Sequence, residues 1–171
     1  FTDPVECKAL PEVINAIKDA DLIIMGPGSL YTSVIPNLLI KEISQAVSNS
    51  KAKKIYVCNI MTQKGETDNY SVASHINAIL RHAGCDNMID AVLVNNVLPT
   101  ELSPTYAKFG SFPVNLDMEN VEPIGVKVVT GNLLQDDECK NGYIRHSYQR
   151  VARAVYYWYR KETKKDKNRR G

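Results

Sequence analysis

The sequence predicts an α/β fold, a three-layer, doubly wound, Rossmann-like sheet whose strands are mostly parallel. Continuous apolar runs of strand length recur along the chain, and such runs are typical of strands buried on both faces of a parallel sheet. Segments with apolar residues at helical spacing separate them, and this alternation favours parallel pairing with right-handed crossovers. The runs that predict buried strands are residues 21–26, 54–60 and 90–95.

The first elements come in the order helix, strand, loop and helix. A helix is expected from Pro11 to about Ala20, because proline fits a first turn and the apolar residues share one face. The run 21–26 ends in glycine, and residues 26–33 form a loop. Apolar residues at helical spacing then predict a helix from about Ile35 to Ser48.

The same order of elements then repeats. Residues 54–60 predict the second buried strand, residues 61–69 a polar loop, and residues 70–82 a helix with an apolar inner face. Residues 90–95 predict a third strand. In doubly wound sheets, ligands bind at the carboxyl ends of the strands, at a topological switch point. We therefore expect the loops that follow the first two strands to lie at one edge of the sheet.

The last third of the chain has a looser pattern. We expect a short helix at residues 99–109 and short strands at residues 113–116 and 126–130. A final helix is predicted from about Arg145 to Tyr159, with a buried apolar stripe. Residues 1–159 are accordingly predicted to form one α/β domain or a large piece of one.

Charge is unevenly distributed along the chain. The formal net charge is +2, but residues 160–171 contain seven Lys or Arg and two Asp or Glu, which gives +5. The remaining residues carry 14 basic and 17 acidic groups, which gives −3. A short basic end of this kind is expected to be a solvated, disordered tail. A weak contact with nucleic acid or acidic lipid is the alternative, and nothing else in the sequence supports it.

The cysteines and the hydropathy of the chain indicate its compartment. No pair of cysteines has CxxC spacing and no histidine cluster accompanies them, so neither disulfides nor a zinc site is predicted. Cys58 lies within an apolar strand and is expected to be a buried small hydrophobe. No run approaches the ~18 apolar residues of a membrane helix, and no signal peptide is predicted. We expect a cytoplasmic protein. The four cysteines are Cys7, Cys58, Cys85 and Cys139.

The segment GPGSLYTS, residues 26–33, is the first candidate ligand site. It follows a predicted buried strand and precedes a helix, which is the context in which a glycine loop binds a ligand. Gly26 and Gly28 lack a Cβ, so ligand atoms can approach the backbone, and the helix start favours a phosphate or diphosphate. Alternatively, Gly-Pro-Gly is only a tight turn and Ser33 only a helix cap. Hydroxyl groups come from Ser29, Thr32 and Ser33.

A second polar loop follows the next strand, at residues 59–67. Its side chains are mostly neutral hydrogen-bonding groups, which suit sugar hydroxyls or the edge of a base. The alternative is a solvated loop in which Thr67 or Asp68 caps the following helix. The candidate binding residues of this loop are Asn59, Thr62, Gln63, Glu66 and Thr67.

Three further residues are weaker candidates. Arg145 can reach a phosphate because a guanidinium matches its geometry, although pairing with a surface carboxylate explains it equally well. Tyr106 can stack on a base, and a packing role is the alternative. His146 is a possible acid or base, but no partner is placed beside it. No metal site is predicted, and neither is a Ser-His-Asp or Cys-His arrangement.

The motifs of the two loops resemble those of a known family. ADLIIMGPGSLYTSVIPNLL at 20–39 and KAKKIYVCNIMTQKGET at 51–67 are followed by a helix carrying His75 and by Ile144-Arg145-His146. This pattern resembles the YvcK family, the gluconeogenesis factor branch of the YvcK/CofD-like superfamily. The CofD branch has a loop similar to GPSNP, so GPGSLY here, which includes Leu30 and Tyr31, favours the YvcK branch.

The resemblance implies a cytoplasmic bacterial protein with a three-layer α/β fold. It implies a regulatory protein that binds a nucleotide diphosphate sugar, UDP-N-acetylglucosamine, and that is linked to cell shape, peptidoglycan precursors and gluconeogenic growth. The resemblance also implies that Tyr106 and Arg145 contribute side chains to the nucleotide-sugar site of the family. The alternative is a CofD-like 2-phospho-L-lactate transferase acting on a deazaflavin, and Mg²⁺ is expected only in that case. An NAD(P)-binding Rossmann domain is less favoured because GxGxxG is absent.

The sequence also departs from the family pattern. The GGGTG loop and DDGGSSG segment of the family's first half are absent, so residues 1–159 resemble the C-terminal part of a YvcK/CofD-like domain. The aspartate that commonly follows Arg-His in the family is Ser147 here, which weakens a catalytic role for His146. The tail after Trp158 looks like an addition that many family members lack. A strand edge left unpaired in such a part would favour association, so a homo-oligomer is a further expectation.

Overall fold

The computed structural model describes residues 7–98, 106, 108, 110–135 and 144–168. The first half alternates helices and strands: α1 (Pro11–Asp19), β1 (Leu22–Met25), α2 (Ile35–Leu38), α3 (Lys41–Asn49), β2 (Lys53–Val57) and α4 (Val72–Ala83). The second half contains β3 (Ala91–Asn95), α6 (Met118–Val121), the 3-10 turn Glu122–Ile124, β4 (Lys127–Gly131) and α7 (Tyr148–Asn168).

The strands form one parallel sheet in the order β1-β2-β3-β4. Leu22 lies opposite Lys53 where β1 meets β2, and Ala91 lies opposite Lys127 where β3 meets β4. The predicted α/β fold with parallel strands is confirmed. Among the described strands the spatial order follows the chain order, so no switch point occurs there. The loops after β1 and β2 still leave the same edge of the sheet, because the strands are parallel.

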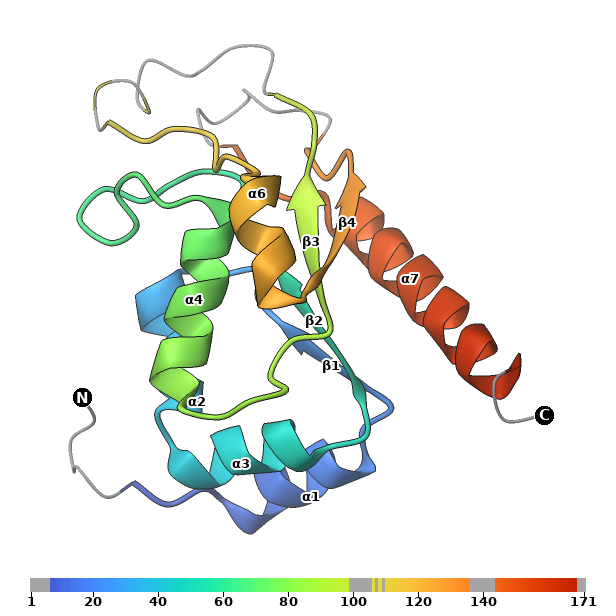
Figure 1. Ribbon diagram of the computed structural model, residues 1–171. Coiled ribbons are helices and arrows are strands. Elements are labelled where there is room, and N and C mark those ends of the chain that lie inside the picture. Colours follow the sequence, from blue (N-terminus) through green and yellow to red (C-terminus); the bar gives the residue numbers. More distant parts are fainter. Residues whose placement is uncertain (1–6, 99–105, 107, 109, 136–143, 169–171) are drawn as a thin grey trace.

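Helices cover both faces of the sheet, which gives the three predicted layers (Figure 1). Successive strand residues point to opposite faces. Tyr56 and Val92 join the core formed with α2, α3, α4 and α6, whereas Ile55 and Leu93 pack against Val155 and Trp158 of α7. Cys58 is buried as expected, with 1% of its surface exposed.

The region after β1 differs from the single helix predicted at residues 35–48. A π-helical turn, Leu30–Val34, comes first, in which the Val34 amide donates to the Ser29 carbonyl. The chain then forms α2 and, after an extended Ile40, the separate helix α3. The break lets α2 pack against α4 while α3 packs against α1, which a single straight helix could not do.

Two other predictions near the end of the chain are corrected. Residues 113–116 form no strand, and only Pro113 makes an isolated bridge, to Met61, because the polar loop after β2 offers one pairing position. The final helix does not end at Tyr159 in a disordered tail but continues to Asn168, since Glu162 packs inward and holds the next turn. The helix predicted at 99–109 lies almost entirely outside the described residues.

No helix in the described part of the chain is both long enough and apolar enough to cross a membrane.

His75 of α4 gives a testable pH dependence of stability. It is fully buried, and its Nδ1 donates to the Ser71 carbonyl at 2.8 Å. Burial lowers the pKa of His75 below 6.5, so below that pH the unfolded chain binds a proton that the folded chain does not. Stability is therefore expected to fall as pH drops from about 7 to about 5, with a slope of up to about 1.4 kcal/mol per pH unit from this residue.

The measurement is urea unfolding at several pH values between these limits. His75→Asn keeps a side-chain donor for the Ser71 carbonyl but does not titrate, so its stability should depend less steeply on pH. The slopes, and not the absolute stabilities, are compared, because the substitution also changes packing. Equal slopes for the two proteins would contradict the assignment to His75.

Candidate functional site

The two predicted loops border one cavity of about 530 Å³ at the carboxyl edge of the sheet. Tyr106, Ser111 and residues 144–146 complete its wall. The predicted site residues that line this cavity are Gly28, Ser29, Asn59, Thr62, Gln63, Tyr106 and Arg145. The other predicted residues, which lie outside its lining, are Gly26, Leu30, Tyr31, Thr32, Ser33, Glu66 and Thr67. Residues that line it and were not predicted as ligand contacts are Pro27, Ile60, Met61, Ser111, Ile144 and His146.

Gly26 turns the chain from β1 into the first loop. Its φ is +77°, in the left-handed region, and a Cβ built on it would lie 2.9 Å from the Val57 carbonyl oxygen of β2. At Gly28 a Cβ would lie 3.3 Å from the Ser33 Cβ, because the loop folds closely onto the turn that follows. A side chain at position 26 would therefore collide with the backbone of β2, and a side chain at position 28 would crowd Ser33.

The amides at the start of this turn already have partners within the protein. Glu66, from the second loop, accepts a hydrogen bond from the Tyr31 amide at 2.7 Å. The Thr32 amide donates to Ser29 Oγ at 3.2 Å, and the Ser33 amide donates to the Ser29 carbonyl at 3.0 Å. The place that the sequence suggested for a ligand phosphate is thus occupied by a carboxylate of the chain itself.

Ser29 has no hydrogen-bonding capacity left for a ligand. Its hydroxyl donates to Glu66 Oε1, and it accepts from the Thr32 amide and the Thr32 hydroxyl. A serine hydroxyl has one donor and two acceptor positions, so all three are engaged. Although Ser29 lines the cavity, its side chain organises the loop, and a ligand would meet the Gly28 backbone beside it.

Glu66 is expected to stabilise the fold by joining the two loops. Its Oε1 accepts from both Ser29 and the Tyr31 amide. Glu66→Ala leaves these donors without their acceptor and should lower the free energy of unfolding by about 1–3 kcal/mol. Glu66→Gln keeps an oxygen in the same position and should cost less. The exposed Glu119 supplies a control variant, Glu119→Ala.

The measurement for these variants is the urea midpoint at constant pH. The expected order of midpoints is wild type, then Glu66→Gln, then Glu66→Ala, with Glu119→Ala near wild type. Glu66→Ala as stable as Glu119→Ala would show that the link between the loops contributes little.

The threonines of the second loop also have structural roles. Thr67 is fully buried, and its Oγ1 accepts from the Gln63 amide at 2.9 Å. Thr62 Oγ1 accepts from the Phe112 amide at 2.9 Å, which ties the loop to the segment that follows β3. The alternative in which Thr67 or Asp68 caps the next helix is wrong, because Ser71 caps α4 by accepting from the Ser74 amide.

The cavity lining also contains polar side chains that suit a ligand, and it carries little negative charge. The side-chain amides of Asn59 and Gln63 make no hydrogen bond to another described residue. Arg145 is exposed, and the described lining contains no carboxylate. Tyr106 is held in place because its hydroxyl accepts from the Ile144 amide at 2.9 Å. This set suits an anionic ligand that also carries hydroxyl or carbonyl groups.

His146 is the most informative additional lining residue. Its Nε2 lies 3.2 Å from the Cys58 carbonyl, and burial lowers its pKa below the usual 6.5. Because a carbonyl only accepts, Nε2 carries the proton, and the neutral ring keeps Nδ1 as an acceptor. The Arg-His pair was a sequence signal for this residue, whereas nothing in the sequence marks Ser111.

Pro27 and His146 also border a second, largely apolar groove of about 480 Å³. This groove lies between β1 and α7, and its lining includes Ile24, which is 50% exposed. Within the described residues, no group of three or more His, Cys, Asp or Glu is placed to hold a metal ion.

Comparison with known proteins gives consistent matches. The family model described as 2-phospho-L-lactate transferase CofD matches residues 1–134. A relative from Nostoc sp., of the gluconeogenesis factor group, is 49% identical over 157 residues, which cover 91% of this chain and 34% of that protein. The gluconeogenesis factor of Bacillus subtilis is 43% identical over 153 residues, 89% of this chain and 47% of that protein.

Solved structures agree with the sequence comparisons. A crystal structure of a UPF0052 family protein from Bacillus halodurans superposes with a TM-score of 0.83 at 38% identity. It covers 90% of this chain and 48% of that one. The chain thus spans less than half the length of the relatives described above.

Proposed function

Because this chain belongs to the CofD family and matches its gluconeogenesis factor members, we propose that it forms part of a regulatory protein that binds a nucleotide diphosphate sugar. UDP-N-acetylglucosamine is the proposed ligand. The observation that carries the proposal is the cavity itself, whose lining contains the cation Arg145 together with the amides of Asn59 and Gln63. The guanidinium of Arg145 can bind a diphosphate, and the side-chain amides can bind sugar hydroxyls or the edge of a base.

The geometry suggests how the ligand would lie. Since Glu66 occupies the Tyr31 amide, the diphosphate would lie outside the turn, near the Gly28 backbone and Arg145. The sugar or base would face Asn59 and Gln63, and Tyr106 adds an aromatic ring to the same lining. Links to cell shape, peptidoglycan precursor supply and gluconeogenic growth are part of the same proposal.

Isothermal titration calorimetry tests the binding. The chain, alone and within any longer polypeptide that its gene encodes, is titrated with UDP-N-acetylglucosamine at up to millimolar concentration. Saturable heat is expected, and UMP should bind more weakly because it lacks the second phosphate and the N-acetylglucosamine group. Absence of heat for both polypeptides would overturn the proposal.

A second candidate is a transferase of the CofD kind, favoured by the description of the matching family model. Such an enzyme would move a phospholactyl group from a nucleotide diphosphate donor to a deazaflavin. Mg²⁺ would neutralise the donor phosphates, and the acidic ligands would have to come from residues outside those described. Mass spectrometry after incubation with donor, deazaflavin and Mg²⁺ distinguishes the two, because only the transferase forms the joined product.

A further inference from the structure

The second half of α7 presents one exposed face that combines cations with tyrosines. The exposed residues lie three or four positions apart, so they share one side of the helix. Tyr156 is 59% exposed and Tyr157 is 72% exposed. Arg160 lies over the Tyr156 ring at 5.8 Å and donates to its hydroxyl. The residues of this face, called the basic-aromatic face below, are Arg153, Tyr156, Tyr157, Arg160, Lys161 and Lys164.

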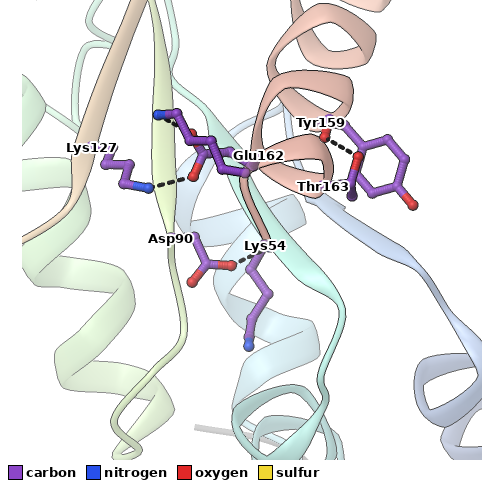
Figure 2. Close-up of polar contacts among 7 residues, drawn as sticks. Lys54, Asp90, Lys127, Tyr159, Glu162 and Thr163 are labelled. Carbon is purple, nitrogen blue, oxygen red and sulfur yellow. Dashed lines mark hydrogen bonds and ion pairs between the residues drawn. The ribbon is translucent and has the colours of Figure 1, made fainter. Parts of the chain in front are cut away.

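The only acidic residue between positions 148 and 165 is kept away from this face. Glu162 has 8% of its surface exposed, and its carboxylate pairs with Lys127 of β4 (Figure 2). The same carboxylate also pairs with Lys165. These lysines hold the pKa of Glu162 below its usual value, so it stays ionised. Its negative charge is therefore neutralised on the inner side of α7, and the basic-aromatic face carries only positive charge.

The same contacts give the face a fixed geometry. Lys127 comes from the sheet, so the ion pair with Glu162 anchors the last turns of α7 to β4 (Figure 2). Thr163 donates to the Tyr159 carbonyl one turn earlier. The cations are thus displayed on an ordered helix, at spacings that the helix sets.

We propose that the basic-aromatic face is a binding surface for single-stranded nucleic acid. Its cations would contact successive phosphates, and its exposed tyrosines would stack on bases, which is how proteins bind single strands without sequence preference. A membrane surface is less suitable as a partner, because an interfacial helix needs a free apolar face. On the other side of this half of α7, the apolar residues Val155 and Trp158 are buried against the sheet.

Fluorescence anisotropy with a labelled oligonucleotide of roughly 20 nucleotides tests the proposal. With three or four phosphate contacts, affinity should fall roughly 15- to 60-fold between about 50 and 200 mM salt. The double variant Arg160→Glu with Lys164→Glu should weaken binding at least about tenfold. Its matched control, Lys41→Glu with Lys51→Glu, makes the same change of net charge at exposed sites elsewhere and should bind as wild type does.

Tyr157→Ala measures the contribution of stacking to oligonucleotide binding, because it removes an aromatic ring and changes no charge. Its affinity should fall by about 5- to 100-fold while the dependence on salt is unchanged. Circular dichroism checks whether α7 remains helical in each variant. Equal losses in the control pair, or binding to anionic phospholipid vesicles but not to the oligonucleotide, would overturn the proposal. Neither outcome bears on nucleotide-sugar binding, because the cavity lies at the other end of α7.

Discussion

Arg145→Ala is expected to weaken binding of UDP-N-acetylglucosamine by about 10- to 100-fold, the usual cost of removing charge-assisted hydrogen bonds to a phosphate. Arg145 is exposed at the cavity rim and is the charged group of its described lining. Arg145→Lys keeps the charge but loses the planar fork, so it should recover part of the affinity. Calorimetry gives the dissociation constants.

Two controls make the Arg145 result specific. Arg153→Ala removes an exposed arginine of α7 outside the cavity and should leave affinity unchanged. Thermal unfolding of each variant shows whether the fold is intact. An Arg145→Ala variant that is folded and binds as tightly as wild type would place the diphosphate elsewhere in the cavity.

Gly26→Ala is expected to give the largest loss of stability, about 2–5 kcal/mol. The left-handed φ of +77° costs an alanine about 1–2 kcal/mol. A further cost of about 1–3 kcal/mol arises because the new Cβ would lie against the Val57 carbonyl, and backbone there can move only by distorting the sheet. Urea unfolding measures the difference in the free energy of unfolding.

Gly65 provides the matched control for this substitution. Its φ is +79°, close to that of Gly26, but a Cβ there would meet nothing within 4 Å. Gly65→Ala should therefore show only the backbone cost of about 1–2 kcal/mol. If the two variants lose equal stability, the close approach of Gly26 to β2 contributes nothing to the loss in the free energy of unfolding.

The strands were predictable because each is recorded in a local pattern. Apolar runs marked β1, β2 and β3, and the glycine and polar loops after the first two strands placed a cavity at the correct sheet edge. The strand predicted at residues 113–116 was wrong, because a short alternating run also suits an extended loop. The disordered tail predicted after Tyr159 was also wrong, because composition alone does not show that Glu162 packs inward.

The sequence by itself determined the order of the elements, the parallel sheet and the two loops that border the cavity. These features follow from spacings of a few residues, which local chemistry dictates. Only the tertiary structure decided that Glu66, and not a ligand, accepts from the Tyr31 amide, and that Ser29 and Thr67 serve the loops themselves. Contacts across 35 residues depend on how the strands bring distant loops together, and no local pattern records that distance.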